Sequence, residues 1–265
     1  SAGGALFVTM VNEGSDITPG DGLCAVSGGG CSLRAAIQEA NAHVGADTIA
    51  FSLPGSGMHV MSITSGPLPA ITEQLTLDGT SQPGCTVPCI VLSGAGLGGT
   101  NNGLSVNTDD SIIQGFIITS WSNYGISIIG NGNIIQSNDI GFWPGNPASL
   151  PNGSGISIQG ANNLIGGTLA GDRNVISGNT GEGIRIGNGC CLPTNANVVR
   201  GNYIGTNETG TAALGNATGI YVSQTATNTI IGGTTASARN VVSGNRGFGI
   251  MVNGAVGTLI QGNYI

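Results

Sequence analysis

Lysine is absent from this chain of 265 residues, and 13 acidic residues outnumber the six arginines, so that the net charge is −7. Nucleic acids bind proteins through basic faces, and this charge balance excludes them as partners. Charged residues make up only 7% of the chain, yet no apolar run approaches the length of a membrane-spanning helix. We therefore expect a protein without a transmembrane segment.

Aromatic residues are also scarce, at 4%, which argues against a large globular core. Glycine is abundant instead, with 49 residues, although 39% of the residues are hydrophobic and the mean hydropathy is +0.22. Disordered chains are polar and poor in β-branched residues, so the glycines here punctuate structure. A narrow core filled by Ile, Val and Leu fits this composition.

The six cysteines fall in three close pairs. Their spacing predicts local disulfides between Cys24 and Cys31 and between Cys85 and Cys89, which implies an oxidising compartment and a secreted, extracellular or cell-surface protein. Neither pair has zinc-finger spacing, and no histidine lies near to complete a metal site. Cys190 and Cys191 are adjacent, so they form either a vicinal bridge or two thiols.

Internal repeats run through the second half of the chain. Five segments share a Gly-Ile-x-(Ile/Val) core, with spacings of 30, 28, 36 and 30 residues between the starts at Gly125, Gly155, Gly183, Gly219 and Gly249. A second motif, Asn-(Ile/Val)-(Ile/Val)-x-x-Asn, starts at Asn133, Asn174, Asn197 and Asn240. Segments 164–168 and 173–179 recur 66 residues later, which equals two coils of a repeating structure.

Such a period is typical of a solenoid. Each coil would hold two or three short strands, in which the alternation of Gly-Ile-x-Ile places both apolar side chains inward. Stacked coils pair their strands in parallel sheets. Glycine and asparagine accept the positive φ angles that corners need, and equivalent asparagines of successive coils stack as amide ladders. The sequence therefore predicts an all-β, right-handed parallel β-helix; the alternative, a β-sandwich, does not repeat its turns at a fixed period.

Residues 1–70 differ from this pattern. A strand at 7–11 is followed by a Gly-rich acidic loop and an amphipathic helix at about 33–44, with Ser32 as its N-cap and Gly45 after its end. The apolar stripe of this helix is Leu33, Ala36, Ile37, Ala40 and Val44. Because the first coil of a β-helix exposes unpaired backbone, we interpret the helix as a cap. It precedes the coils of residues 71–265, in one continuous domain, and segments 75–77, 90–92, 104–106 and 112–118 read as the early coils.

The segment 31–37, Cys-Ser-Leu-Arg-Ala-Ala-Ile, resembles the CSLREA-type domain found at the start of many bacterial secreted β-helix proteins. Segments 77–84 and 201–206 fit the same family, so the resemblance covers nearly the whole chain. It implies an extracellular, surface-associated protein, but no single biochemical activity. One departure is Ala35, where the family usually has Glu. That Glu would complete a capping box with Ser32, and its absence weakens the helix start by less than about 1 kcal/mol.

Many β-helices are polysaccharide lyases or hydrolases, whose chemistry needs paired carboxylates or an acidic Ca²⁺ cluster. The candidates here, Asp109, Asp110 and Asp139, assemble no site, so we expect no catalytic residues and no enzyme; a polysaccharide lyase is the enzyme alternative. No metal site or cofactor is expected, with one candidate exception. The acidic residues around the first cysteine loop, which either bind Ca²⁺ or form a solvated loop, are Glu13, Asp16, Asp21 and Asp47.

Trp121, Tyr124 and Trp143 flank the first Gly-Ile strand at a separation of about one coil. Two interpretations are open for these residues: an aromatic ledge that binds a sugar ring, or packing of the side chains as loop residues against the coils, which we favour. Weak glycosylation sequons begin at Asn152, Asn207 and Asn216.

The last residues, 263–265, match residues 202–204 in the middle of a coil, and no helix, charged strand or proline follows them. Either the chain is a fragment whose further coils cover this end, or a second copy covers it by donating the strand at 7–11, which generates filaments. We therefore expect an extracellular structural or adhesive β-helix whose partner is itself, head to tail, or a surface carbohydrate. The alternative is a carbohydrate-binding module or a polysaccharide lyase on the same scaffold.

Overall fold

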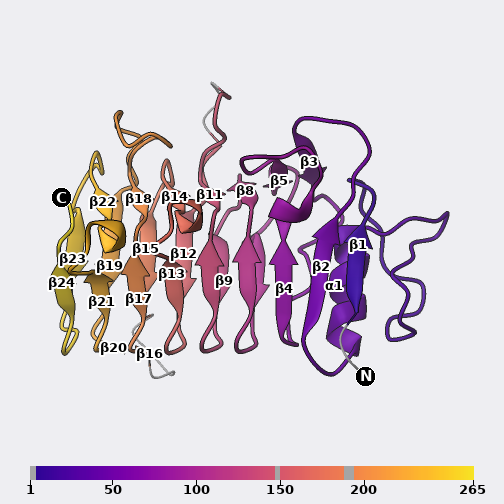
Figure 1. Cartoon of the computed structure of the whole chain (residues 1–265), viewed down its shortest axis with the longest axis horizontal. Helices are drawn as coiled ribbons and strands as arrows, with labels where there is room; N and C mark the ends of the chain where they lie inside the picture. Colours follow the sequence, from indigo (N-terminus) through magenta and orange to yellow (C-terminus); the bar gives the residue numbers. More distant parts are fainter. Residues whose placement is uncertain (1–3, 147–149, 188–193) are drawn as a thin grey trace.

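The chain folds into stacked coils, as the computed structural model shows for residues 4–146, 150–187 and 194–265 (Figure 1). Each complete coil contributes one strand to each of three long sheets, and the described strands within these sheets pair in parallel. The predicted parallel β-helix is thus confirmed, with three strands per coil.

The nine-stranded sheet holds β1 (Ala5–Val8), β2 (Asp47–Phe51), β4 (Leu75–Asp78), β7 (Ile112–Gln114), β10 (Ile134–Gln136), β13 (Leu164–Gly166), β17 (Val198–Arg200), β21 (Ile230–Gly232) and β24 (Leu259–Gln261). The seven-stranded sheet holds β3 (His59–Ser62), β5 (Ile90–Ser93), β8 (Phe116–Thr119), β11 (Asp139–Ile140), β14 (Val175–Ile176), β18 (Tyr203–Ile204) and β22 (Val241–Val242). The six-stranded sheet holds β6 (Leu104–Val106), β9 (Tyr124–Ile128), β12 (Ser154–Ile158), β15 (Glu182–Ile186), β19 (Thr218–Val222) and β23 (Ile250–Val252). A short pair, β16 (Thr194–Asn195) with β20 (Ala226–Thr227), and three 3-10 turns, η1 (Gly79–Ser81), η2 (Ala170–Asp172) and η3 (Ala236–Ala238), complete the described elements with the helix α1.

The Gly-Ile-x-(Ile/Val) segments form the strands of the six-stranded sheet. Ile126, Ile156 and Ile184 pair in register and are fully buried, so they fill the narrow core that the composition predicts. The intervening x residues form a separate column: Ser127, Ser157, Arg185, Tyr221 and Met251. One-residue alternation along each strand therefore separates the core from the outer face of the coil.

Asparagine ladders follow three corners of the coil. In each ladder the side-chain oxygen of one asparagine accepts a hydrogen bond from the asparagine in the preceding coil. The donor is the backbone N–H, except between Asn152 and Asn179, where it is the side-chain amide of Asn152. The three ladders are Asn133, Asn163 and Asn197; Asn138, Asn174, Asn202, Asn240 and Asn263; and Asn152, Asn179, Asn216 and Asn245. The predicted amide ladders are confirmed. The Asn-x-x-x-x-Asn motif, however, occupies two different pairs of corners, so it is not one repeated position.

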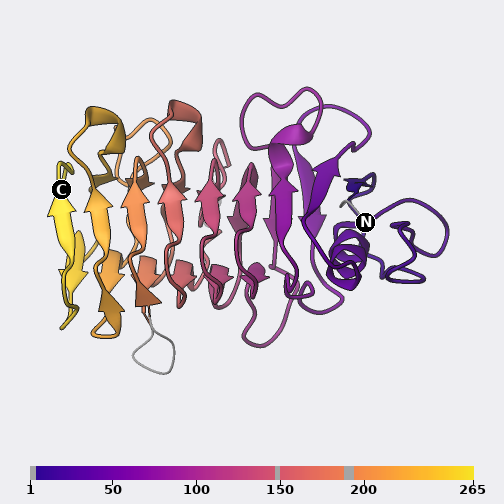
Figure 2. The ribbon, with the colours of Figure 1, turned by 60° about the horizontal axis from the view of Figure 1, so that its bottom comes forward.

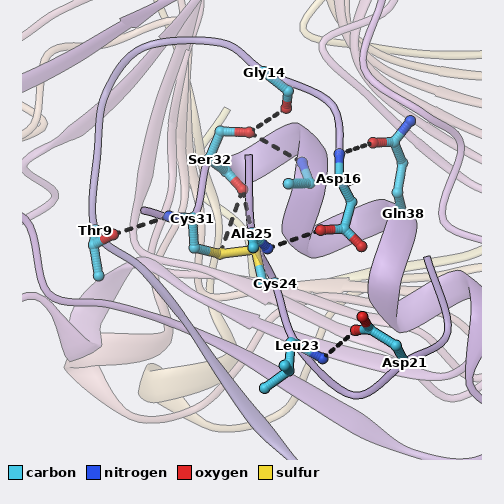
Figure 3. The surroundings of a disulfide bond; sticks show 11 residues. Thr9, Gly14, Asp16, Asp21, Leu23, Cys24, Ala25, Cys31, Ser32 and Gln38 are labelled. Carbon is cyan, nitrogen blue, oxygen red and sulfur yellow. Dashed lines mark hydrogen bonds between the residues drawn. A yellow bond between two sulfur atoms is a disulfide. The ribbon is translucent and has the colours of Figure 1, made fainter. Parts of the chain in front are cut away.

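The helix α1 (Leu33–Ala42) lies against β1 and β2 at the end of the coils opposite the C-terminus (Figure 2). Ser32 caps it as predicted, because its hydroxyl accepts a hydrogen bond from the N–H of Ala35 and donates one to the carbonyl of Gly14 (Figure 3). The buried carboxylate of Glu39 accepts hydrogen bonds from the N–H groups of Gly20 and Gly22, which ties the preceding loop to the helix.

Two predicted boundaries are wrong. The helix ends at Ala42, so Val44 lies beyond it and is 88% exposed instead of completing the apolar stripe. The first strand is Ala5–Val8 and not 7–11. The segment 112–118, predicted as part of the early coils, forms the two strands β7 and β8. Gly115 adopts a φ of +84° between them and turns the chain from the nine-stranded to the seven-stranded sheet.

Candidate binding site

Asp139 occupies an exceptional position on strand β11. Its register partners in the neighbouring coils are Ile117 and Val175, and the column continues with Tyr203 and Val241. The adjacent Ile140 is part of the core, so the Asp139 side chain lies on the opposite, outer face of the sheet. An apolar residue would suit this column better, which suggests that the carboxyl serves a purpose other than stability.

A hollow of about 410 Å³ lies over this position. One side is formed by the disulfide loop, from which Val87 and Pro88 line the space, and the other by η2 and Arg173. The turn η2 is fixed to the preceding coil, because the hydroxyl of Ser137 donates a hydrogen bond to the carbonyl of Gly171. The volume falls within the range of small-molecule sites, and its walls are held by covalent and hydrogen bonds.

The carboxyl of Asp139 lines this hollow while only 7% of the residue is exposed. Within residues 4–146, 150–187 and 194–265, no hydrogen-bond donor reaches its oxygens. Burial raises the pKa of Asp139 to about 7, and the nearby charge of Glu208 raises it further in the same direction. Asp139 is therefore a carboxylic acid that can donate or release a proton near neutral pH.

Glu208 reaches the hollow from a loop two coils further along the chain. This loop follows β18 and is closed by an antiparallel bridge between Thr206 and Ala213. The side chain of Asn207 accepts hydrogen bonds from the N–H groups of Thr211 and Ala212, which stiffens the turn. The sequence analysis missed Glu208, because nothing in the loop's sequence indicates that it folds back over earlier coils.

Arg173 lines the same hollow, but its guanidinium is already engaged. It lies 4.0 Å from the centre of the Tyr203 ring, and its Nε donates a hydrogen bond to the carbonyl of Gly201. Arg239 repeats the arrangement one period later, with the Tyr264 ring and the carbonyl of Gly262. Both arginines are therefore parts of the repeat, and Arg173 forms a wall of the hollow.

Trp121, the first residue of the candidate aromatic ledge, is 1% exposed and packs inside the coil. Its indole N–H donates to the carbonyl of Leu92, and its ring fills space that Gly94 and Gly103 leave in the preceding coil. Tyr124 and Trp143 are half-buried, with Tyr124 at the start of β9. A sugar ledge formed by Tyr124 and Trp143 stays a prediction.

The other predicted acidic candidates do not gather with Asp139. Asp109 and Asp110 lie at the corner between β6 and β7, where Asp109 accepts hydrogen bonds from the backbone and side chain of Asn131. A whole strand of the nine-stranded sheet separates that corner from the column of Asp139.

The acidic residues around the first cysteine loop and the helix are only partly engaged in hydrogen bonds. Glu13 pairs with Arg34 at 2.6 Å, and Asp16 accepts a hydrogen bond from the N–H of Ala25. Asp21 accepts one from the N–H of Leu23, while Asp47 is buried at the start of β2. Among the described residues, no donor reaches Oδ2 of Asp16 or Oδ2 of Asp47. Among the described residues, no group of three or more His, Cys, Asp or Glu side chains could hold a metal ion.

The structure contains both predicted disulfides, Cys24–Cys31 and Cys85–Cys89. Cys190 and Cys191 lie outside the described residues. Of the sequon asparagines, Asn152 and Asn216 are fully buried in a ladder, so their amides are inaccessible to a glycosyl transferase in the folded chain, whereas Asn207 lies in the partly exposed loop of Glu208.

No protein-family model and no curated protein matches this chain. Among the described residues, no helix is both long and apolar enough to cross a membrane.

Proposed function

We propose that the protein is an extracellular adhesive β-helix that binds a surface glycan in the hollow over Asp139. The observation that carries this proposal is a buried carboxyl that has no hydrogen-bond partner among the described residues. It stands in a column that is otherwise apolar or aromatic. Sugars present several hydroxyl groups that can satisfy such a carboxyl, together with a C–H face that packs on apolar walls such as Val87 and Pro88. The two disulfides and the resemblance of the cap segment to CSLREA-type proteins support an extracellular location.

Binding can be tested with a glycan array probed by the fluorescently labelled chain. We expect selective retention on a subset of glycans, and loss of that retention in Asp139→Val, which copies the residue at the equivalent position of the next coil. The matched control is Glu73→Gln, which removes an acidic group outside the hollow and should bind like the wild type. Absence of glycan binding, or equal binding by Asp139→Val, would contradict the proposal.

The proposal treats the hollow as a binding site and not as a catalytic one. The polysaccharide lyase alternative is tested by incubating the chain with the glycans retained on the array. New reducing ends, or the unsaturated products of elimination, would show that the chain cleaves these glycans and would favour the enzyme alternative. Incubation with and without Ca²⁺ covers the metal-dependent form of that reaction.

Head-to-tail self-association remains a prediction. Strand β1 is already paired with β2 over four residues, so donating it to another copy would cost that pairing. Sedimentation of the full chain at increasing concentration measures whether it associates at all.

A further inference from the structure

The hollow over Asp139 carries an unbalanced charge. Two acidic side chains, Asp139 and Glu208, line it together with one basic side chain, Arg173. The guanidinium of Arg173 is held over the Tyr203 ring and by the carbonyl of Gly201, and not on either acid. The two acids therefore face the same space without a cation between them.

A ligand that complements this hollow must both donate a hydrogen bond to the carboxyl of Asp139 and provide a positive charge. A neutral hydroxyl can satisfy the carboxyl of Asp139, but it does not offset the repulsion by Glu208 that arises when Asp139 ionises. A carboxylated sugar would add a third negative group to the same space. An ammonium group instead donates up to three hydrogen bonds and pairs with both acids.

The protein itself has no ammonium side chain to offer, because the chain lacks lysine. Its net charge of −7 also favours the approach of cationic ligands from solution. The positive group that complements the two acids must then come from the ligand.

The walls of the hollow indicate what carries that ammonium. Val87 and Pro88 on the disulfide loop, and Val175 beside Asp139, give an apolar surface next to the two acids. The C–H face of a pyranose ring matches such a surface, and an amino sugar places its ammonium directly on the ring. A thin, flexible alkyl ammonium would leave most of this surface uncovered.

We infer that the hollow binds an amino sugar with a free ammonium group, so that the glycan recognised by this protein is a de-N-acetylated hexosamine polymer. The inference rests on the proposed function and names its ligand class. Asp139 and Glu208 accept hydrogen bonds from the ammonium, while Val87, Pro88 and Val175 pack against the ring.

Isothermal titration of the full chain with glucosamine, N-acetylglucosamine and galacturonic acid oligomers of equal length tests the inference. We expect the glucosamine oligomer to bind at least about tenfold more tightly than the other two, which is the usual effect of a charge-assisted hydrogen bond. In Asp139→Asn and in Glu208→Gln this preference should fall to about one, whereas Glu73→Gln should keep it.

The outcomes separate this inference from the proposal on which it rests. Equal affinity for the glucosamine and N-acetylglucosamine oligomers would overturn the amino-sugar inference and leave glycan binding intact. Binding of a lysine peptide as tight as that of the glucosamine oligomer would also overturn it, since the sugar ring would then contribute nothing. If no glycan binds, on the array or in solution, the proposed function itself fails.

Discussion

A corner asparagine stabilises the coil because its side-chain amide bonds both to the coil below and to the coil above. The oxygen of Asn202 accepts hydrogen bonds from the N–H and the amide of Asn174, and its own amide donates to the carbonyl of Ile165 and to Asn240. All of these groups lie out of contact with water, where an unpaired polar group is costly. The ladder thus satisfies the backbone at a turn that no sheet hydrogen bond reaches.

Replacement of Asn202 by Ala should therefore be strongly destabilising. The change leaves at least two buried polar groups unpaired, and we expect the free energy of unfolding to fall by about 3 kcal/mol or more. The matched control is Asn263→Ala in the same ladder, where the residue is half-buried and water can replace the lost bonds, so its effect should be smaller. Urea denaturation measures both, and equal losses would contradict this account of the ladder.

Ionisation of the buried carboxyl of Asp139 destabilises the folded chain, in contrast to the hydrogen bonds of the asparagine ladder. Because its pKa of about 7 in the folded chain lies above its ordinary value of 3.8, the folded state keeps a proton that the unfolded chain releases between about pH 4 and 7. The stability that Asp139 contributes is therefore full below pH 4 and decreases as the pH rises through that window, by at most about 1.4 kcal/mol per pH unit. The charged groups that face it across the hollow are Glu208 and Arg173.

The measurement is urea denaturation of the wild type and Asp139→Asn at several pH values from 4 to 8. The variant should gain stability relative to the wild type as the pH rises, since its amide does not ionise. The wild type and the variant are compared at each pH because Glu13 changes the stability in the other direction, contributing stability that is lost as the pH falls. Burial alone would raise the pKa of Glu13, but hydrogen bonds from Arg34 and from the N–H groups of Thr64 and Ser65 lower it to about 2. A constant difference between variant and wild type would show that Asp139 does not titrate in this range.

At the scale of elements, the disulfide loop 85–89 forms one wall of the hollow. Replacing both Cys85 and Cys89 by Ser opens a loop of four-residue separation, and chain-entropy arguments give a loss of about 2 kcal/mol. We expect glycan affinity to fall as well, because Val87 and Pro88 lose their fixed position over Asp139. Thermal unfolding and titration with the glycan retained on the array measure the two effects.

The double variant Cys24→Ser/Cys31→Ser is the matched control. Its disulfide closes a loop of similar length, with a separation of seven residues, and it lies beside the capping helix, away from the hollow. It should lower stability by a similar amount and leave glycan affinity unchanged. Loss of affinity in both double variants would mean that the hollow responds to general stability and not to its own wall.

Elements with strong periodicity could be predicted from the sequence. The strands of the six-stranded sheet follow from Gly-Ile-x-Ile alternation, and the helix start follows from Ser32 as N-cap. The end of that helix could not be located, because His43 and Val44 continue a helical pattern in the sequence while the chain turns away after Ala42. The corner at Gly115 was hidden within an apolar segment, since glycine marks many positions that are not corners in this chain.

The candidate site was less predictable than the fold. Asp139 was recognised as a candidate carboxylate, but its burial depends on loops from three other coils that the sequence does not place. Glu208 was missed for the same reason. For Trp121 the sequence left a sugar ledge and packing against the coils as alternatives, and it could not show that Gly94 and Gly103 leave room for the ring inside the coil. Such space is a property of stacked coils and not of any single segment.

At the scale of the whole molecule, the absence of lysine restricts cleavage by trypsin to six arginines. Five of them are at least half-buried, and Arg173 and Arg239 are stacked on tyrosine rings. Only Arg246 is exposed, and it lies between β22 and β23, near the edge of the stack, where fewer coils oppose local opening. Stability against opening should therefore rise from this edge toward the middle of the stack.

We expect trypsin to cut the native chain first after Arg246, at least about tenfold faster than at Arg173 or Arg200. Loss of residues 247–265 removes the carbonyl of Gly262 and the ring of Tyr264 from Arg239, so Arg239 should be cut second. Intact-mass spectrometry during limited digestion follows this order. In Arg246→Gln the first cleavage of the chain should be slower than in the wild type, because Arg239 keeps its partners. Early cleavage at Arg173 or Arg200 would instead mean that single coils open independently and that the ladders do not bind the stack into one cooperative unit.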